Sequence, residues 1–192
     1  NGLMQVYRFT APQVSRNQLN LLSSHDTERF LHLAKGDTKL QALAATLQMT
    51  WVGAPSIYYG EEIGMPGGRD PDNRRPMDWD KVTRSNELLA HYKKLIRLRT
   101  RSRVLASGDP YPLLANDEKK VVAFGRVLFE EAMMTVLNRS DKPQTLSIPV
   151  QTLPESALNT IKREGLTGED GRKFKLSQSK TITVTLGPVS GL

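Results

Sequence analysis

The side chains best suited to chemistry lie in two segments, and each segment follows a short apolar run. In the first segment, His25, Asp26 and Glu28 come directly after the run at 19–22. Chemistry in parallel β/α folds is placed where strands end and loops begin, so a carboxylate here is well positioned for catalysis. The residues themselves slightly favour another interpretation, in which Asp26 or Thr27 caps the next helical turn and His25 is hydrogen-bonded in place.

The second segment is the loop 64–80, which is dense in glycine, proline, aspartate and arginine. Loops of this length without internal periodicity are usually functional or disordered. Its clustered charged residues are Arg69, Asp70, Asp72, Arg74, Arg75 and Asp78. The run 70–73 resembles a calcium loop in composition but lacks the ligand spacing and closing glutamate of an EF-hand. On composition alone, a surface ion-pair network is the favoured interpretation.

The elements that must position these segments alternate between strand and helix. The run 19–22 has the length of a buried strand, and 56–59 is expected to be the next strand. Between them, 36–38 supplies a break and an N-cap for an amphipathic helix, with apolar positions at Leu40, Leu43, Ala44, Leu47 and Trp51. A second helix is expected from residue 85 or 86, with a buried stripe of Leu88, Leu89, Tyr92, Leu95 and Ile96. This alternation indicates a parallel β/α architecture.

The pattern of expected secondary structure changes after about Arg103. The run 107–110 is expected to be a turn, and short alternating segments separated by turns follow it. The expected strands are 120–129, 132–137, 146–150 and 182–186. Regularly spaced short strands of this kind are typical of an antiparallel sandwich. The predicted fold class is therefore α/β followed by all-β, with one domain at 1–102 and a second at 103–192.

The amino-acid composition argues against several classes of function. The chain has 192 residues, of which 38% are hydrophobic and 24% charged, as in ordinary globular proteins. It has no cysteine, which excludes disulfides and thiolate metal sites and suits a cytoplasmic location. The net charge of +7 invites a nucleic-acid interpretation, but the arginines at 97–103 suit a helix C-terminus and aromatic residues are only 6%. We predict no nucleic-acid partner, and no membrane partner because no apolar run is long enough to cross a bilayer.

Five stretches of the sequence resemble the α-amylase family of glycoside hydrolases. Residues 24–29, Ser-His-Asp-Thr-Glu-Arg, are similar to the signature at the end of barrel strand seven, and residues 53–65 to strand eight. Residues 67–79, Gly-Gly-Arg-Asp-Pro-Asp-Asn-Arg-Arg-Pro-Met-Asp-Trp, resemble the following loop in the neopullulanase, cyclomaltodextrinase and maltogenic amylase subgroup. Residues 86–99 resemble the last barrel helix, and 187–191 resemble the final strand of the C-terminal β-sandwich. The resemblance implies the C-terminal part of a (β/α)8 TIM barrel followed by an antiparallel β-sandwich domain.

The resemblance also implies roles for four residues. Asp26 matches the family's third catalytic carboxylate, which binds sugar hydroxyls in the distorted ring and stabilises the oxocarbenium-like transition state. His25 matches the imidazole that donates to the same sugar. Asp70 and Arg74 match the pair that holds a glucose unit farther from the cleavage point. This resemblance favours a catalytic role for Asp26 over the helix cap.

A retaining glycosidase also needs a carboxylate nucleophile and a carboxylic acid about 5 Å apart. The family supplies them from barrel strands four and five, in motifs that this sequence lacks. We therefore expect the chain to be the C-terminal part of an α-glucan hydrolase or transglycosylase, and to be inactive by itself. Strands seven and eight without their neighbours have open edges, which predicts that the barrel part is poorly ordered, self-associates or docks with a complementary fragment.

Two other interpretations remain open. One is an oligo-1,6-glucosidase, although the loop at 70–79 favours the neopullulanase subgroup. The other is a non-catalytic amylase-like scaffold or a carbohydrate-contact module. The joint presence of His25, Asp26, Asp70 and Arg74 favours a catalytic parent that acts on an α-glucan or a maltooligosaccharide. The resemblance implies no metal and no cofactor in this segment, and it leaves calcium open for the full-length enzyme.

Overall fold

The computed structural model describes residues 5, 7, 9–168 and 172–191, and it divides into two compact units. One unit comprises residues 17–101, and the other comprises 102–192 together with 1–16. The domain limits 1–102 and 103–192 remain a prediction.

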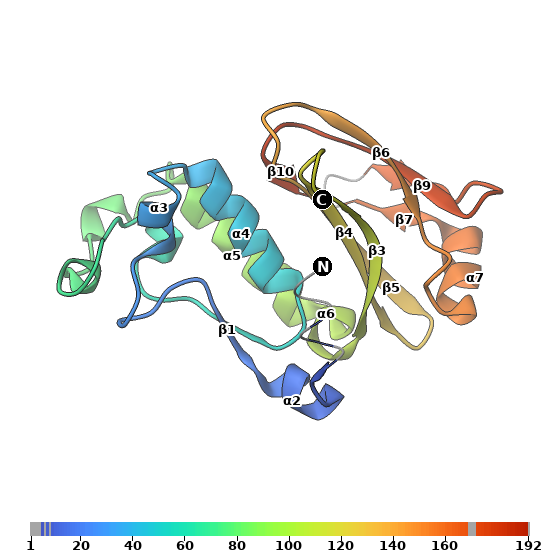
Figure 1. The fold of residues 1–192 in the computed structure, drawn as a ribbon, viewed down its shortest axis with the longest axis horizontal. Coiled ribbons are helices and arrows are strands. Elements are labelled where there is room, and N and C mark those ends of the chain that lie inside the picture. Colours follow the sequence, from blue (N-terminus) through green and yellow to red (C-terminus); the bar gives the residue numbers. More distant parts are fainter. Residues whose placement is uncertain (1–4, 6, 8, 169–171, 192) are drawn as a thin grey trace. The chain divides into compact units, whose positions relative to one another are not determined.

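The unit 17–101 contains a short pair of parallel strands and several helices (Figure 1). In chain order its elements are β1 (Leu19–Leu21), α3 (Phe30–Leu33), α4 (Thr38–Thr50), β2 (Ala54–Ser56), η1 (Glu61–Ile63), η2 (Asp72–Arg74), η3 (Trp79–Lys81) and α5 (Glu87–Arg101). β1 and β2 are parallel, with Leu19 opposite Ala54 and Leu21 opposite Ser56. The strand expected at 56–59 is displaced, because the backbone beyond Ser56 bonds to side chains instead of to a neighbouring strand.

The helix α4 begins where the sequence predicted, because the Asp37 carboxylate accepts hydrogen bonds from the backbone N–H groups of Lys39 and Leu40. Of the apolar positions predicted for its buried face, Leu43 and Trp51 are buried, but Leu40, Ala44 and Leu47 are only half-buried. Two polar residues, Gln41 and Gln48, are buried instead. The Gln48 amide donates to the carbonyls of Asn20 at 2.9 Å and Ser56 at 2.8 Å. This glutamine thereby joins the two strands to the helix that connects them.

The helix α5 starts after Asn86, whose side-chain oxygen accepts from the N–H of Leu89. Four of the five residues predicted for its buried stripe are buried, and Ile96 is 40% exposed. The helices α4 and α5 lie side by side (Figure 1), and they share a core of Ala45, Met49, Leu88, Tyr92 and Leu95. Near the end of α5, the Arg99 guanidinium donates to the carbonyls of Met49, Trp51 and Gly53, which satisfies the C-terminus of α4.

The second unit is built mainly from antiparallel strands. Its elements are α2 (Pro12–Asn17), α6 (Arg103–Ser107), β3 (Asp109–Asn116), β4 (Val121–Leu128), β5 (Glu131–Asn138), β6 (Gln144–Pro149), α7 (Glu155–Glu164), β7 (Leu166–Thr167), β8 (Lys173–Phe174), β9 (Thr181–Leu186) and β10 (Ser190–Gly191). One sheet has the order β10-β5-β4-β3, and β6 pairs with β9. The expected turn at 107–110 is wrong, because Pro110 already pairs with Arg126 as part of β3.

One apolar core joins the four-stranded sheet and the β6–β9 sheet of this unit, which also has a third, two-stranded sheet of β7 and β8. It contains Val121, Val136, Ile148 and Ile182, among other buried aliphatic residues of β3, β4, β5, β6 and β9. The alternation expected around 146–150 and 182–186 is confirmed, since each strand turns its apolar side chains inward. Two sheets over a shared core form a sandwich.

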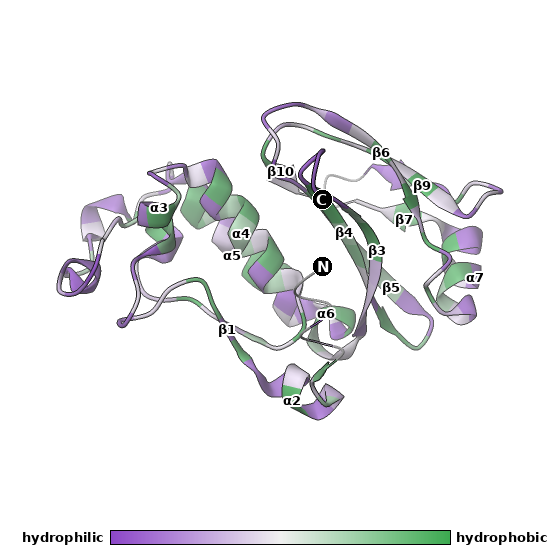
Figure 2. Cartoon of the chain, in the orientation of Figure 1, coloured by the Kyte–Doolittle hydropathy of each residue, from purple (hydrophilic) through white to green (hydrophobic). Residues whose placement is uncertain are grey.

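The helix α7 was not predicted from the sequence. Ala157, Leu158 and Ile161 are its buried residues, and they belong to the same core as the sheets. Figure 2 shows hydrophobic and hydrophilic patches on different sides of this short helix. Among the described residues, no helix is long and apolar enough to cross a membrane.

Candidate active site

The turn that carries Asp26 is fixed by its own polar side chains. The Ser24 N–H donates to the Thr27 hydroxyl at 2.9 Å, and the Asp26 N–H donates to the Ser24 hydroxyl at 3.1 Å. The residue preceding α3 is Arg29, whose side chain makes no cap hydrogen bond, and the N–H of Phe30 at the start of α3 donates to the Ser23 hydroxyl. The Asp26 carboxylate is therefore not used as a helix cap, in contrast to the interpretation that the residues alone favoured.

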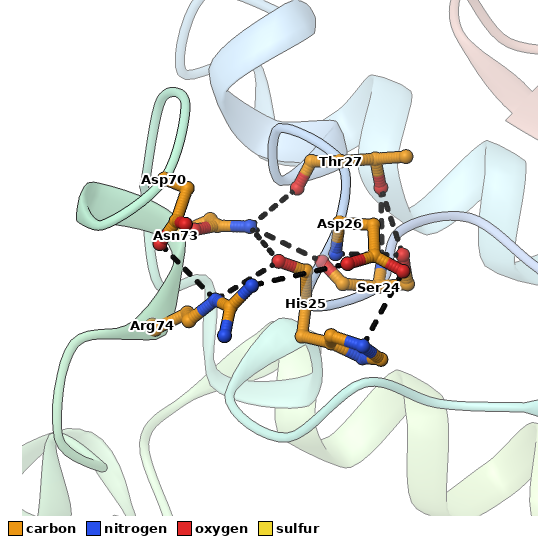
Figure 3. A network of polar contacts seen from close by, with 7 residues as sticks. All are labelled: Ser24, His25, Asp26, Thr27, Asp70, Asn73 and Arg74. Atoms are coloured by element: carbon orange, nitrogen blue, oxygen red, sulfur yellow. Dashed lines mark hydrogen bonds and ion pairs between the residues drawn. The ribbon is translucent and has the colours of Figure 1, made fainter.

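The structure brings His25, Asp26, Asp70 and Arg74 together (Figure 3). His25 Nε2 lies 3.3 Å from one Asp26 carboxylate oxygen, and Arg74 Nη2 lies 3.8 Å from the other. Arg74 Nε lies 3.1 Å from Asp70 Oδ1. One guanidinium thus connects two carboxylates that come from separate loops.

The cluster is open to solutes. The side chains of Asp26 and Asp70 are 71% and 60% exposed. Both line a surface hollow of about 580 Å3, together with Thr27, Glu28, Leu33 and Arg69. Carboxylate oxygens accept hydrogen bonds, whereas imidazole and guanidinium donate them, so the group matches the mixed donor and acceptor character of sugar hydroxyls.

Asn73 belongs to this network, although nothing in its sequence context predicted a role for it. It is fully buried, and its amide nitrogen donates to the carbonyls of His25 at 2.8 Å and Thr27 at 2.9 Å, with Ser24 at 3.4 Å. Because Asn73 precedes Arg74, this amide fastens the loop that bears Arg74 to the turn that bears Asp26 (Figure 3). An asparagine in a charged, aperiodic loop cannot be distinguished from a solvated one by its sequence context.

Arg29 is a second residue whose importance became evident only in the structure. Its guanidinium is fully buried and donates from Nε to the Asn73 carbonyl at 2.9 Å and from Nη1 to the Tyr59 carbonyl at 2.6 Å. Its charge lies 4.6 Å from the ring centroid of Tyr58 and 4.8 Å from that of Tyr59. The Arg29 N–H also donates to the carbonyl of Gly67. Arg29 therefore joins the segment after β2 to the loop that contains Asn73.

Gly67 is required where this loop passes Asn73. A Cβ atom on Gly67 would lie 2.8 Å from the Asn73 Cα, which is too close for a side chain. Close backbone approach of this kind is a common reason for glycine in a functional loop.

Asp72 fixes the conformation of the loop through its carboxylate. Its carboxylate accepts from the Gly68 N–H and from Arg75 Nε, both at 2.6 Å. The Gly68 N–H and the Arg75 guanidinium lower the pKa of the Asp72 carboxyl. Within the described ranges, no group of three or more His, Cys, Asp or Glu residues is arranged to hold a metal ion. Calcium binding by a longer protein stays a prediction.

Glu61 is a buried carboxyl that contacts Ser23, the residue directly before the turn that carries Asp26. It is 1% exposed, it accepts from the Ser23 hydroxyl, and it accepts from the Tyr58 N–H at 3.3 Å. Burial raises the pKa of the Glu61 carboxyl, and the hydrogen bond from Ser23 opposes that shift. Since Ser23 also accepts from the Phe30 N–H, Glu61 links the start of α3 to η1.

Comparison with known proteins identifies the family. Residues 3–108 match the family model of the α-amylase catalytic domain. The cyclomaltodextrinase of Geobacillus thermopakistaniensis (strain MAS1) is 37% identical over 97% of this chain and 30% of its own length. Neopullulanase 2 of Thermoactinomyces vulgaris is 40% identical over 94% of this chain and 29% of its own length.

Solved structures show the same fold. The native form of the Nostoc punctiforme debranching enzyme superposes with a TM-score of 0.83 and 31% identity, over 98% of this chain and 37% of that chain. The chain spans about 30% of the length of the curated relatives it matches. Its fold is the C-terminal part of a (β/α)8 TIM barrel followed by antiparallel β-sheets. The chain therefore belongs to the α-amylase family of glycoside hydrolases.

Proposed function

We propose that this chain forms part of an enzyme that hydrolyses or transfers α-glucans by a retaining mechanism. The nucleophile and the acid/base would come from a portion of the enzyme outside this chain. The observation that carries the proposal is the convergence of His25, Asp26, Asp70 and Arg74 beside one hollow. The printed names of the relatives, cyclomaltodextrinase and neopullulanase, support an α-glucan or a maltooligosaccharide as the substrate.

Asp26 is the proposed transition-state stabiliser. Cleavage of a glycosidic bond flattens the sugar ring and builds positive charge at its anomeric carbon. A carboxylate that accepts hydrogen bonds from the ring hydroxyls binds this distorted sugar more strongly than the relaxed one, which lowers the barrier. His25, 3.3 Å from Asp26, would donate to a hydroxyl of the same sugar.

Asp70 and Arg74 are proposed to hold a second glucose unit. Their ion pair leaves further donor and acceptor positions unused, and both side chains are at least 46% exposed. A glucose unit held there would bring binding energy from a remote part of the substrate to the reacting centre.

The test is the Asp26→Asn substitution in the full-length enzyme. We expect turnover of maltooligosaccharides to fall about a hundred- to a thousand-fold, which is the typical loss when one group that stabilises a transition state is removed from an enzyme. The unfolding temperature should stay unchanged. Asp80→Asn, at an exposed aspartate of η3, is the matched control and should leave turnover unchanged. Unchanged turnover in Asp26→Asn would refute the role proposed for Asp26, whereas a full-length protein without turnover would favour the non-catalytic scaffold.

We also propose that the purified 192-residue chain is inactive and self-associates. In the described part of the chain, β1 and β2 pair with no strand other than each other, and Leu19 and Leu21 are exposed. Sedimentation at several concentrations would detect association, and a chain that stays monomeric throughout would contradict it. A panel with α-1,6-linked oligosaccharides would test the oligo-1,6-glucosidase alternative on the full-length enzyme.

A further inference from the structure

We infer that Asn73 is a positioning residue that acts through Asp26, an inference that rests on the function proposed above. Its amide fixes the backbone on both sides of the catalytic carboxylate, without contact to the substrate hollow. The inference begins from one geometric fact: the carbonyls of His25 and Thr27, the two neighbours of Asp26, both receive hydrogen bonds from the same buried nitrogen.

The amide nitrogen carries two protons, and three carbonyl oxygens surround it. The distances of 2.8 Å to His25 and 2.9 Å to Thr27 are ordinary hydrogen bonds, whereas 3.4 Å to Ser24 is long. The two protons are therefore engaged by the residues that flank Asp26. The Asn73 Oδ1 atom is buried and has no hydrogen-bond partner among the described residues, so the donor nitrogen is the functional half of this side chain.

Asn73 is itself held from the opposite side. Arg29 Nε binds its carbonyl at 2.9 Å, and the backbone of Gly67 passes against its Cα. The next residue, Arg74, uses Nε to contact both the His25 carbonyl and Asp70 Oδ1 at 3.1 Å. A fixed Asn73 therefore sets the spacing between Asp26 and the Asp70–Arg74 pair.

Two substitutions at Asn73 distinguish the effect of its N–H donors from the effect of its side-chain shape. Asn73→Ala removes both hydrogen bonds, so the Thr27 carbonyl loses this donor and the His25 carbonyl keeps the contact from Arg74 Nε. Asn73→Asp keeps the shape of the side chain, but it presents oxygen atoms to carbonyl oxygens where N–H groups had been. We therefore expect the isosteric aspartate variant to lose at least as much turnover as the alanine variant.

A double-mutant cycle in the full-length enzyme tests the inference. The variants are Asn73→Ala, Asp26→Asn and their combination, with kcat and KM measured on a maltooligosaccharide. We expect Asn73→Ala to lower kcat about 10- to 100-fold, since an error of about 1 Å in catalytic geometry can cost about a hundredfold. In the Asp26→Asn background, where the group that Asn73 positions is already disabled, the same substitution should change kcat less than about threefold.

Asn138 provides the matched control. It is also fully buried, and its amide donates to the carbonyls of Lys142 at 2.9 Å and Gly187 at 2.7 Å within the sandwich unit. Asn138→Ala should lower the unfolding temperature and leave kcat unchanged. If Asn73→Ala does not fold, Asn73→Ser, which retains one donor, replaces it in the same cycle.

The outcomes are distinguishable. Independent, multiplicative losses for Asn73→Ala and Asp26→Asn, or an unchanged kcat in Asn73→Ala while Asp26→Asn is impaired, would overturn the inference and leave the proposed function standing. Unchanged turnover in Asp26→Asn would overturn the proposed function itself. Strong coupling between the two positions, absent for Asn138, would support the positioning role.

Discussion

Replacement of the buried Arg29 should loosen the whole loop assembly around Asp26. Arg29→Met keeps a similar length and apolar stem but removes the guanidinium. The carbonyls of Asn73 and Tyr59 then lose their donors, and the stacking on Tyr58 and Tyr59 is lost as well. The unit 17–101 should therefore unfold more easily.

The magnitude follows from these contacts. Two hydrogen bonds from a charged donor are worth about 1.5–3 kcal/mol each, which sets an upper limit of about 6 kcal/mol. Part of this is offset, because methionine removes the cost of burying a charge, and Arg29 Nη2 has no hydrogen-bond partner among the described residues. We expect a net loss of about 2–4 kcal/mol in the free energy of unfolding. Arg29→Lys should cost at least as much, because an ammonium remains buried and cannot replace the guanidinium fork.

Tryptophan emission provides an assay that is specific to this unit. Both tryptophans of the chain, Trp51 and Trp79, lie within residues 17–101. Trp51 is 9% exposed, so its emission should shift to longer wavelength when this unit unfolds in urea. The midpoint and slope of that transition give the free energy of unfolding.

Arg97→Met is the control, because Arg97 is exposed on α5 and its loss should change the free energy by less than about 0.5 kcal/mol. A loss below about 1 kcal/mol in Arg29→Met would refute the reasoning. So would a lysine variant clearly more stable than the methionine variant, since it would show that the charge alone matters and the two carbonyl contacts do not.

Two further predictions concern the buried carboxyl and the sandwich core. Burial raises the pKa of the Glu61 carboxyl above its ordinary value of 4.5, so its contribution to stability is present at low pH and is lost as pH rises through the raised pKa. Glu61→Gln should therefore flatten the decline in stability above about pH 4.5, as measured by urea unfolding from pH 4 to 8; an identical decline in both proteins would contradict this. Ile148 is fully buried opposite Ile182, and its replacement by alanine should lower the free energy of unfolding by about 2–5 kcal/mol. Val122→Ala, at an exposed position, is its control. The free energy of unfolding is measured by urea unfolding followed by far-UV circular dichroism. A loss below about 1 kcal/mol in Ile148→Ala would indicate that the core is not packed as described.

Elements defined by periodicity were predictable from the sequence. The helix α5 and the strands β4, β5, β6 and β9 were expected near their observed positions, because each turns apolar side chains toward a core. The helix α4 was also expected near its observed position, although its buried face includes Gln41 and Gln48. The start of α4 was predictable as well, since Asp37 is a favourable N-cap residue and its carboxylate accepts from two backbone N–H groups.

Elements that depend on tertiary partners were not predictable. The strand β2 ends at Ser56 because the Tyr58 N–H bonds to Glu61 and the Tyr59 carbonyl bonds to Arg29. α7 is short, with three buried residues, and it follows a segment read as strands. A local pattern of this length does not separate helix from strand.

The candidate site divides in the same way. His25, Asp26, Asp70 and Arg74 were identified through resemblance, and their chemical character is visible in their side chains. Asn73 is a small polar residue among charged neighbours, and its importance depends on three carbonyls that lie 46 to 49 positions away in the sequence. Such long-range satisfaction of backbone groups leaves no trace in local composition.

The composition of β3 has a consequence for the integrity of the sandwich unit. β3 is the last strand of its sheet and carries Pro110 and Pro112, which lack the N–H group that a further strand would need. A strand from another copy that paired with this edge strand would lack two backbone hydrogen-bond donors. The two prolines therefore disfavour edge-to-edge association into fibrils. Replacement of both prolines by threonine would test directly whether they protect the edge strand β3 against association.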